Sequence, residues 1–108
     1  MNTTRIAALR AQCGGPRDGA LLRFSLGSAL LEAGDAAEAR TEFERATGLD
    51  PAYSAAWKLL GKACLQAGDA AAAAAAWRRG IAAAEARGDE QARKEMSVFL
   101  RRLERPAG

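Results

Sequence analysis

The chain has 108 residues, enough for one domain with a modest hydrophobic core that needs no disulfide or metal ion to fold. Its 16 basic and 13 acidic residues are interleaved and give a net charge of +3. This lacks the concentrated basic stripe typical of nucleic-acid-binding proteins, so we expect no nucleic-acid partner. The chain has no histidine and no CxxC or Cys/His motif, so we expect no metal ion and no other cofactor.

The sequence shows no segment suited to a membrane. Arg5 and Arg10 interrupt the N-terminal region, so no apolar run there reaches the about 7–15 residues of a secretory signal. No later stretch approaches the roughly 20 apolar residues that span a bilayer. We therefore expect a cytoplasmic protein in which Cys13 and Cys64 are reduced thiols; a disulfide between them is the alternative.

The first predicted element is a short helix over residues 3–13, with Ile6 and Leu9 on its inward face. The Gly-Gly-Pro run at 14–16 ends it. Asp18 is then expected to cap the next helix through its side-chain oxygen.

Residues 20–53 and 54–87 are two copies of one 34-residue unit, each predicted to form a pair of helices. Two dipeptides recur in the same frame, Leu26-Gly27 with Leu60-Gly61 and Gly34-Asp35 with Gly68-Asp69. Each Gly-Asp pair predicts a turn, because glycine ends one helix in the left-handed conformation and aspartate caps the next.

Gly27 and Gly61 fall inside the first helix of each unit, where glycine costs roughly 0.5–1 kcal/mol relative to alanine. Close approach of a neighbouring helix to a position without a side chain is expected to offset this cost. Asp50-Pro51 predicts the start of the second unit's first helix. The next stop signal is Gly88-Asp89, so the preceding helix is expected to be long, over about residues 69–87.

The last predicted element is an amphipathic helix over residues 89–105. Met96, Phe99, Leu100 and Leu103 share one face at helical spacing, and Pro106 is expected to end the helix. No Leu-Gly pair occurs in it, so we interpret it as a capping helix rather than as a further repeat.

The repeat pattern resembles the tetratricopeptide repeat, W-x2-L-G-x2-Y followed by A-x3-F and P. The matching residues are Trp57, Leu60, Gly61, Ala73 and Trp77 in the second unit and Leu26, Gly27, Ala39, Phe43 and Pro51 in the first. The resemblance implies an all-α fold, a right-handed α-solenoid of two helix-turn-helix units flanked by an N-terminal helix and a C-terminal capping helix. It also implies a protein-protein interaction module, whose first helices line a concave surface that binds a partner protein or peptide.

Carried over by position, the partner-binding surface is expected to contain Leu21, Phe24, Ser28, Leu31, Lys58, Lys62, Leu65 and Arg93, with Ser97 beside them. Lys58 and Lys62 share a face and could hold an acidic side chain or a carboxyl terminus, or could simply be solvated. Burial of Leu21, Phe24 and Leu31 under the N-terminal helix is the alternative for that part of the surface.

No nucleophile motif and no glycine-rich phosphate loop is present, so we expect no enzymatic activity. Self-association into a homo-oligomer, without a separate peptide ligand, is the alternative function.

Overall fold

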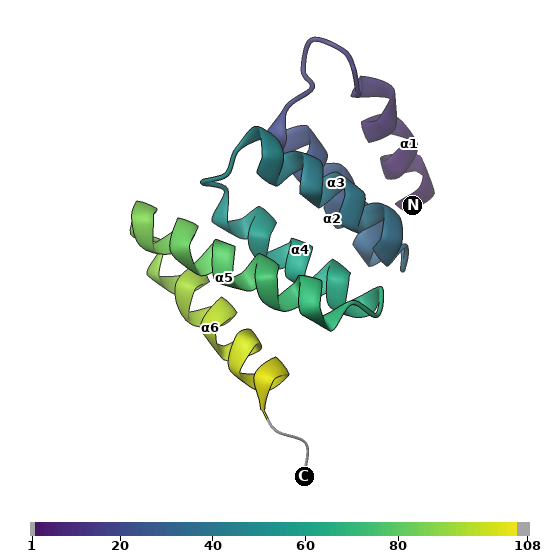
Figure 1. Ribbon diagram of the computed structural model, residues 1–108. Helices are drawn as coiled ribbons and strands as arrows, with labels where there is room; N and C mark the ends of the chain where they lie inside the picture. Colours follow the sequence, from purple (N-terminus) through teal and green to yellow (C-terminus); the bar gives the residue numbers. More distant parts are fainter. Residues whose placement is uncertain (1, 106–108) are drawn as a thin grey trace.

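The computed structural model describes residues 2–105, which form six helices (Figure 1). In chain order they are α1 (Asn2–Gln12), α2 (Ala20–Glu32), α3 (Ala36–Leu49), α4 (Ser54–Gln66), α5 (Ala70–Arg87) and α6 (Glu90–Glu104). No strand occurs in this described part of the chain. As predicted, α5 is long, with 18 residues.

The helices form two antiparallel pairs, α2 with α3 and α4 with α5, which stack on each other through α3 and α4. Helix α1 packs on α2 at one end of the stack, and α6 packs on α5 at the other. At the backbone level α2 contacts α4 and α4 contacts α6, whereas within residues 2–105 the backbones of α1, α3 and α5 do not meet. The stack is therefore curved, with α2, α4 and α6 on its inner, concave side.

The turns follow the predicted glycine and aspartate signals. Gly34, Gly68 and Gly88 have φ angles of 86°, 86° and 73°, the left-handed conformation that side chains disfavour. The aspartates that follow them, Asp35, Asp69 and Asp89, each accept a hydrogen bond from a backbone N–H in the first turn of the next helix. Both parts of the turn prediction are confirmed.

Two predicted helix starts are wrong. Asp18 does not cap α2, because its carboxylate accepts hydrogen bonds from Gly14 N and from the guanidinium of Arg23. Pro51 lies in the turn before α4 rather than in its first helical turn, and Tyr53 occupies the N-cap position. Pro106, which was expected to end the last helix, lies outside the described residues.

Each helix pair crosses at its interior glycine, as the sequence predicts. A Cβ atom on Gly27 would come within 2.8–3.0 Å of three ring carbons of Phe43, and one on Gly61 would overlap the indole of Trp77. Phe43 and Trp77 are almost fully buried at the two crossings. The missing side chains therefore admit the large aromatic rings that fill the core.

The core is continuous from α2 to α6, and Met96 of α6 is completely buried in it. Gly80 of α5 admits this contact, because a Cβ atom there would overlap the Met96 sulfur and come within 2.7 Å of Trp57 Cβ. Helix α6 is thus an integral part of the stack, and it closes the hydrophobic end of the second helix pair.

Candidate binding surface

The concave side of the stack is the candidate binding surface, because α1 leaves it uncovered. Among residues 2–105 the backbone of α1 contacts that of α2 alone. Two of its arginines pair with glutamates on either side of the α2–α3 turn, Arg5 with Glu32 at 3.7 Å and Arg10 with Glu38. Helices α4 and α6 therefore face the concave side without a covering element (Figure 1).

The predicted residues of α2 have mixed environments. Leu21 is 69% exposed, so it is not buried under α1. The ring of Phe24 stacks on that of Tyr53 at 4.9 Å and lies 5.9 Å from that of Phe43. This side chain therefore packs at the junction between the two helix pairs.

Two other predicted residues of α2 are engaged within the fold. The hydroxyl of Ser28 donates a hydrogen bond to the backbone oxygen of Phe24 at 2.9 Å, and Leu31 is half-buried against the core. The hydroxyl proton of Ser28 is thus used within α2, and Leu31 contributes to the core.

Lys58 and Arg93 already have acidic partners. Lys58 Nζ lies 3.4 Å from Glu95 Oε1, an ion pair that bridges α4 and α6. Arg93 donates two hydrogen bonds to Glu90, and they hold the pKa of that carboxyl below its usual value. Ser97, beside them on α6, is half-buried.

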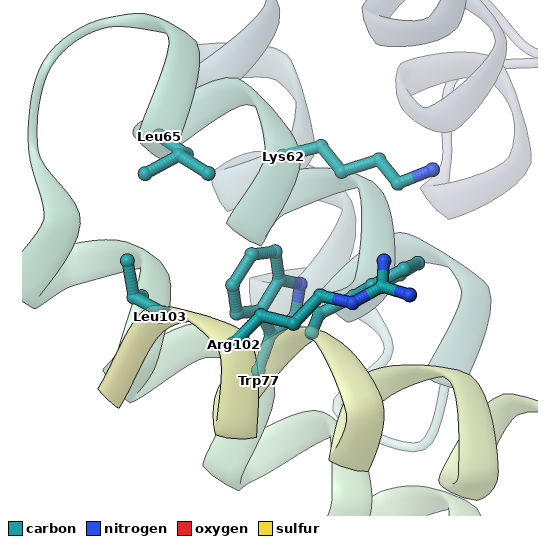
Figure 2. A pocket seen from close by; sticks show the side chains of 6 residues that line it. Lys62, Leu65, Trp77, Arg102 and Leu103 are labelled. Carbon is teal, nitrogen blue, oxygen red and sulfur yellow. The ribbon is translucent and has the colours of Figure 1, made fainter. Parts of the chain in front are cut away.

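Lys62 and Leu65 are brought together at a pocket of about 360 Å³ between α4, α5 and α6. Its lining consists of Lys62 and Leu65 of α4, Trp77 of α5, and Phe99, Arg102 and Leu103 of α6. Figure 2 shows the two leucines at one end, the charged groups of Lys62 and Arg102 extending toward the other, and Trp77 between them. We call this feature the α4–α6 pocket.

Contacts within the pocket hold its walls in place. The indole N–H of Trp77 donates a hydrogen bond to the backbone oxygen of Lys58 at 3.0 Å, which fixes the ring with its polar atom satisfied. The ring of Phe99 lies 5.4 Å from that of Trp77, and Lys62 Nζ lies 4.9 Å from the centre of the Phe99 ring. The pocket therefore has an apolar floor built from two aromatic rings.

Sequence reasoning missed the contributions of Phe99, Arg102 and Leu103, because it assigned α6 to a cap. A signal was present, since Phe99 follows Leu65 by the same 34 residues that separate Leu65 from Leu31. Extending the repeat period by one more unit places Phe99 on the surface predicted for Leu65.

Cys13 and Cys64 are free thiols, and burial raises the pKa of Cys64. In residues 2–105 no cluster of three or more potential metal-ligating side chains occurs. No helix in the same range is long and apolar enough to cross a membrane.

A family model described as the tetratricopeptide repeat matches residues 6–53 and 24–90. The chain belongs to this family. A tetratricopeptide-repeat-containing protein of Pseudomonas aeruginosa is 57% identical over 88 residues, which are 82% of this chain and 84% of that protein. A solution structure of a Bordetella parapertussis protein is 46% identical, with a TM-score of 0.77 over 94% of this chain and 85% of that one. The tetratricopeptide domain of Sgt2 from Aspergillus fumigatus is 28% identical, with a TM-score of 0.68 over 99% of this chain and 76% of its own.

The all-α helical-repeat solenoid inferred from the sequence is confirmed by these matches. Tetratricopeptide repeats are in general non-enzymatic modules that bind proteins or peptides. The relatives from Pseudomonas and Bordetella suggest a bacterial origin for this chain.

Proposed function

We propose that this tetratricopeptide chain is a bacterial adaptor without enzymatic activity, which binds a partner protein through the concave surface of α2, α4 and α6. The observation that carries the proposal is the α4–α6 pocket, which opens on this surface and is left uncovered by α1. Leu65 is 43% exposed at its edge. An exposed apolar side chain beside a concave pocket is a common feature of protein-binding sites.

Capture of a partner from a lysate of the source bacterium tests the proposal. The tagged wild-type chain is compared with Leu65→Glu, which places a charge at the pocket, and with Leu49→Glu as a matched control. Leu49 is 61% exposed and belongs to α3, outside the concave layer. We expect a protein that wild type and Leu49→Glu retain and Leu65→Glu loses. Equal retention by all three chains contradicts binding through this surface.

Self-association is a second candidate function, favoured by two strongly exposed leucines. Leu21 and Leu49 are 69% and 61% exposed, and both belong to the first helix pair. Such side chains are suited to an interface between copies. Light scattering at increasing protein concentration tests self-association. A chain that stays monomeric contradicts it, and an oligomer that Leu21→Glu or Leu49→Glu converts to monomers supports it.

We also propose a cytoplasmic location, as the sequence led us to expect. Fractionation of the source bacterium, followed by immunodetection of the chain, checks this part of the proposal.

A further inference from the structure

The two ends of the α4–α6 pocket differ in chemistry. Leu65, Trp77 and Leu103 give one end apolar walls, and Lys62 and Arg102 place two positive charges at the other (Figure 2). Apolar walls favour an apolar ligand group because its burial removes surface from water. Two cations at one end favour a carboxylate.

Neither cation is neutralised inside the fold. Within residues 2–105, Lys62 and Arg102 take part in no ion pair, although neighbouring residues do. Lys58 pairs with Glu95, and Arg78 pairs with Glu104. Two cations without an ion pair thus line the same pocket, and an acidic ligand complements them.

The size of the pocket limits what enters it. Its volume of about 360 Å³ lies near the lower end of the range of roughly 300–1,000 Å³ for small-molecule sites. A single large side chain such as leucine, together with the adjoining backbone, suits a space of this size.

On the basis of the proposed function, we propose that the α4–α6 pocket binds an internal acidic segment of the partner protein. One large apolar side chain of the segment occupies the space between Leu65, Trp77 and Leu103. A neighbouring aspartate or glutamate of the segment pairs with Lys62 and Arg102. A side-chain carboxylate is sufficient for this pairing, because Lys62 and Arg102 place their charges at the same end of the pocket.

Synthetic peptides, acetylated and amidated so that no terminal charge remains, test this proposal. The panel consists of an acidic peptide with one central leucine, the same peptide with alanine for leucine, and a version with lysine for every acid. A fourth peptide is the acidic leucine peptide with a free carboxyl terminus. Nuclear magnetic resonance titration follows the indole N–H signal of Trp77. The indole of Trp57, bonded to Pro51 O, is an internal reference outside the pocket.

We expect the amidated acidic leucine peptide to shift the Trp77 signal and saturate, with little change at Trp57. Alanine for leucine is expected to weaken binding about tenfold or more, since the peptide loses most of the apolar surface that it buries in the pocket. The lysine peptide is expected not to bind. No saturable shift at millimolar peptide, equal binding of the alanine or lysine peptide, or binding of the free-acid peptide alone each overturns the proposal.

Protein variants test whether the charges at the pocket, and not the overall charge or the fold, determine peptide binding. Lys62→Gln combined with Arg102→Gln is expected to lower the affinity for the acidic leucine peptide about tenfold. The double variant is also expected to make binding less dependent on salt concentration. Lys94→Gln combined with Arg101→Gln removes the same charge from α6 residues that do not line the pocket, and is expected to have a much smaller effect. Equal weakening by the two pairs overturns recognition at the pocket. Circular dichroism and thermal unfolding verify that all chains are folded.

The outcome is distinguishable from that of the lysate capture. Suppose that Leu65→Glu loses the partner but the Lys62→Gln, Arg102→Gln variant retains it. The partner then binds the concave surface, as proposed, but not through an acidic side chain at the pocket. Conversely, a saturable acidic-peptide response without any partner captured through Leu65 supports the pocket assignment and contradicts the proposed adaptor.

Discussion

The two helix pairs share one backbone frame but use different chemistry at the same positions. In the second pair, the indole of Trp57 donates to Pro51 O at 2.8 Å, and Arg79 lies 4.5 Å from the centre of its ring. In the first pair, Arg23 stands at the equivalent position and binds Asp18 and Glu42.

The difference continues one helix further. Glu42 is only 6% exposed and also pairs with Arg45, whereas its equivalent in the second pair is the buried Ala76. The first pair is thus joined by a chain of ion pairs and the second by aromatic packing. One helical frame tolerates both, because the buried carboxylate of Glu42 is paired with the guanidinium groups of Arg23 and Arg45. The helical frame therefore depends on the crossing glycines and aromatic residues, which both pairs have, more than on the side chains beside them.

The largest predicted effect concerns the aromatic side chains at the two crossings. Trp77→Ala and Phe43→Ala are each expected to lower the free energy of unfolding by about 3–5 kcal/mol, because both side chains are buried. Trp77→Ala is expected to cause the larger loss of stability, because the indole also contacts Phe99 and donates a hydrogen bond to Lys58 O. Urea denaturation followed by circular dichroism measures both. A smaller loss for Trp77→Ala than for Phe43→Ala contradicts the ranking, and Trp77→Phe should recover part of the loss.

The next effect concerns the crossing glycines. Gly61→Ala is expected to destabilise the chain by about 1–3 kcal/mol and Gly27→Ala by less, because the added methyl group overlaps the rigid indole of Trp77 more deeply than the ring of Phe43. Thermal and urea unfolding measure the difference.

Gly48→Ala is the matched control for the glycine series. Gly48 is helical, and a Cβ atom there would meet nothing within 4 Å. Alanine at this position is expected to leave stability unchanged or raise it by up to about 1 kcal/mol, from helix propensity alone. Equal losses at all three positions would mean that the methyl group's neighbours do not determine the effect.

Much of this architecture is predictable from local signals. All six helices are predicted by three signals: the 34-residue repeat, the glycine-aspartate turns and the apolar face of the last helix. The turn and face signals are reliable because each acts within one turn or one helix. Asp18 and Pro51 were misassigned because their roles depend on contacts outside the local sequence. The guanidinium of Arg23 competes for Asp18, and the turn over residues 50–53 displaces Pro51 from α4.

The candidate site was less predictable, since a pocket requires knowledge of which faces meet. Lys62 and Leu65 were identified from the repeat frame, and they line the pocket. Arg102 carries no signature of its own in the sequence, and only the packing of α6 against α4 and α5 places it opposite Lys62. Likewise, the pairing of Lys58 with Glu95 joins residues 37 positions apart, and no local pattern predicts it.

The smallest predicted effect is a pH dependence specific to the ion pairs of the first helix pair. The hydrogen bonds from Arg23 hold the pKa of Asp18 below its ordinary value of 3.8. A lowered pKa in the folded state stabilises the fold fully above pH 3.8, and this contribution is lost as the pH falls through the lowered pKa. Asp18→Asn should therefore lower the melting temperature more at pH 6 than at pH 3. Glu85→Gln removes the same charge from an exposed residue that forms no ion pair among the described residues, and its effect should vary less with pH. If both variants show the same pH profile, the Asp18–Arg23 pair does not contribute to stability.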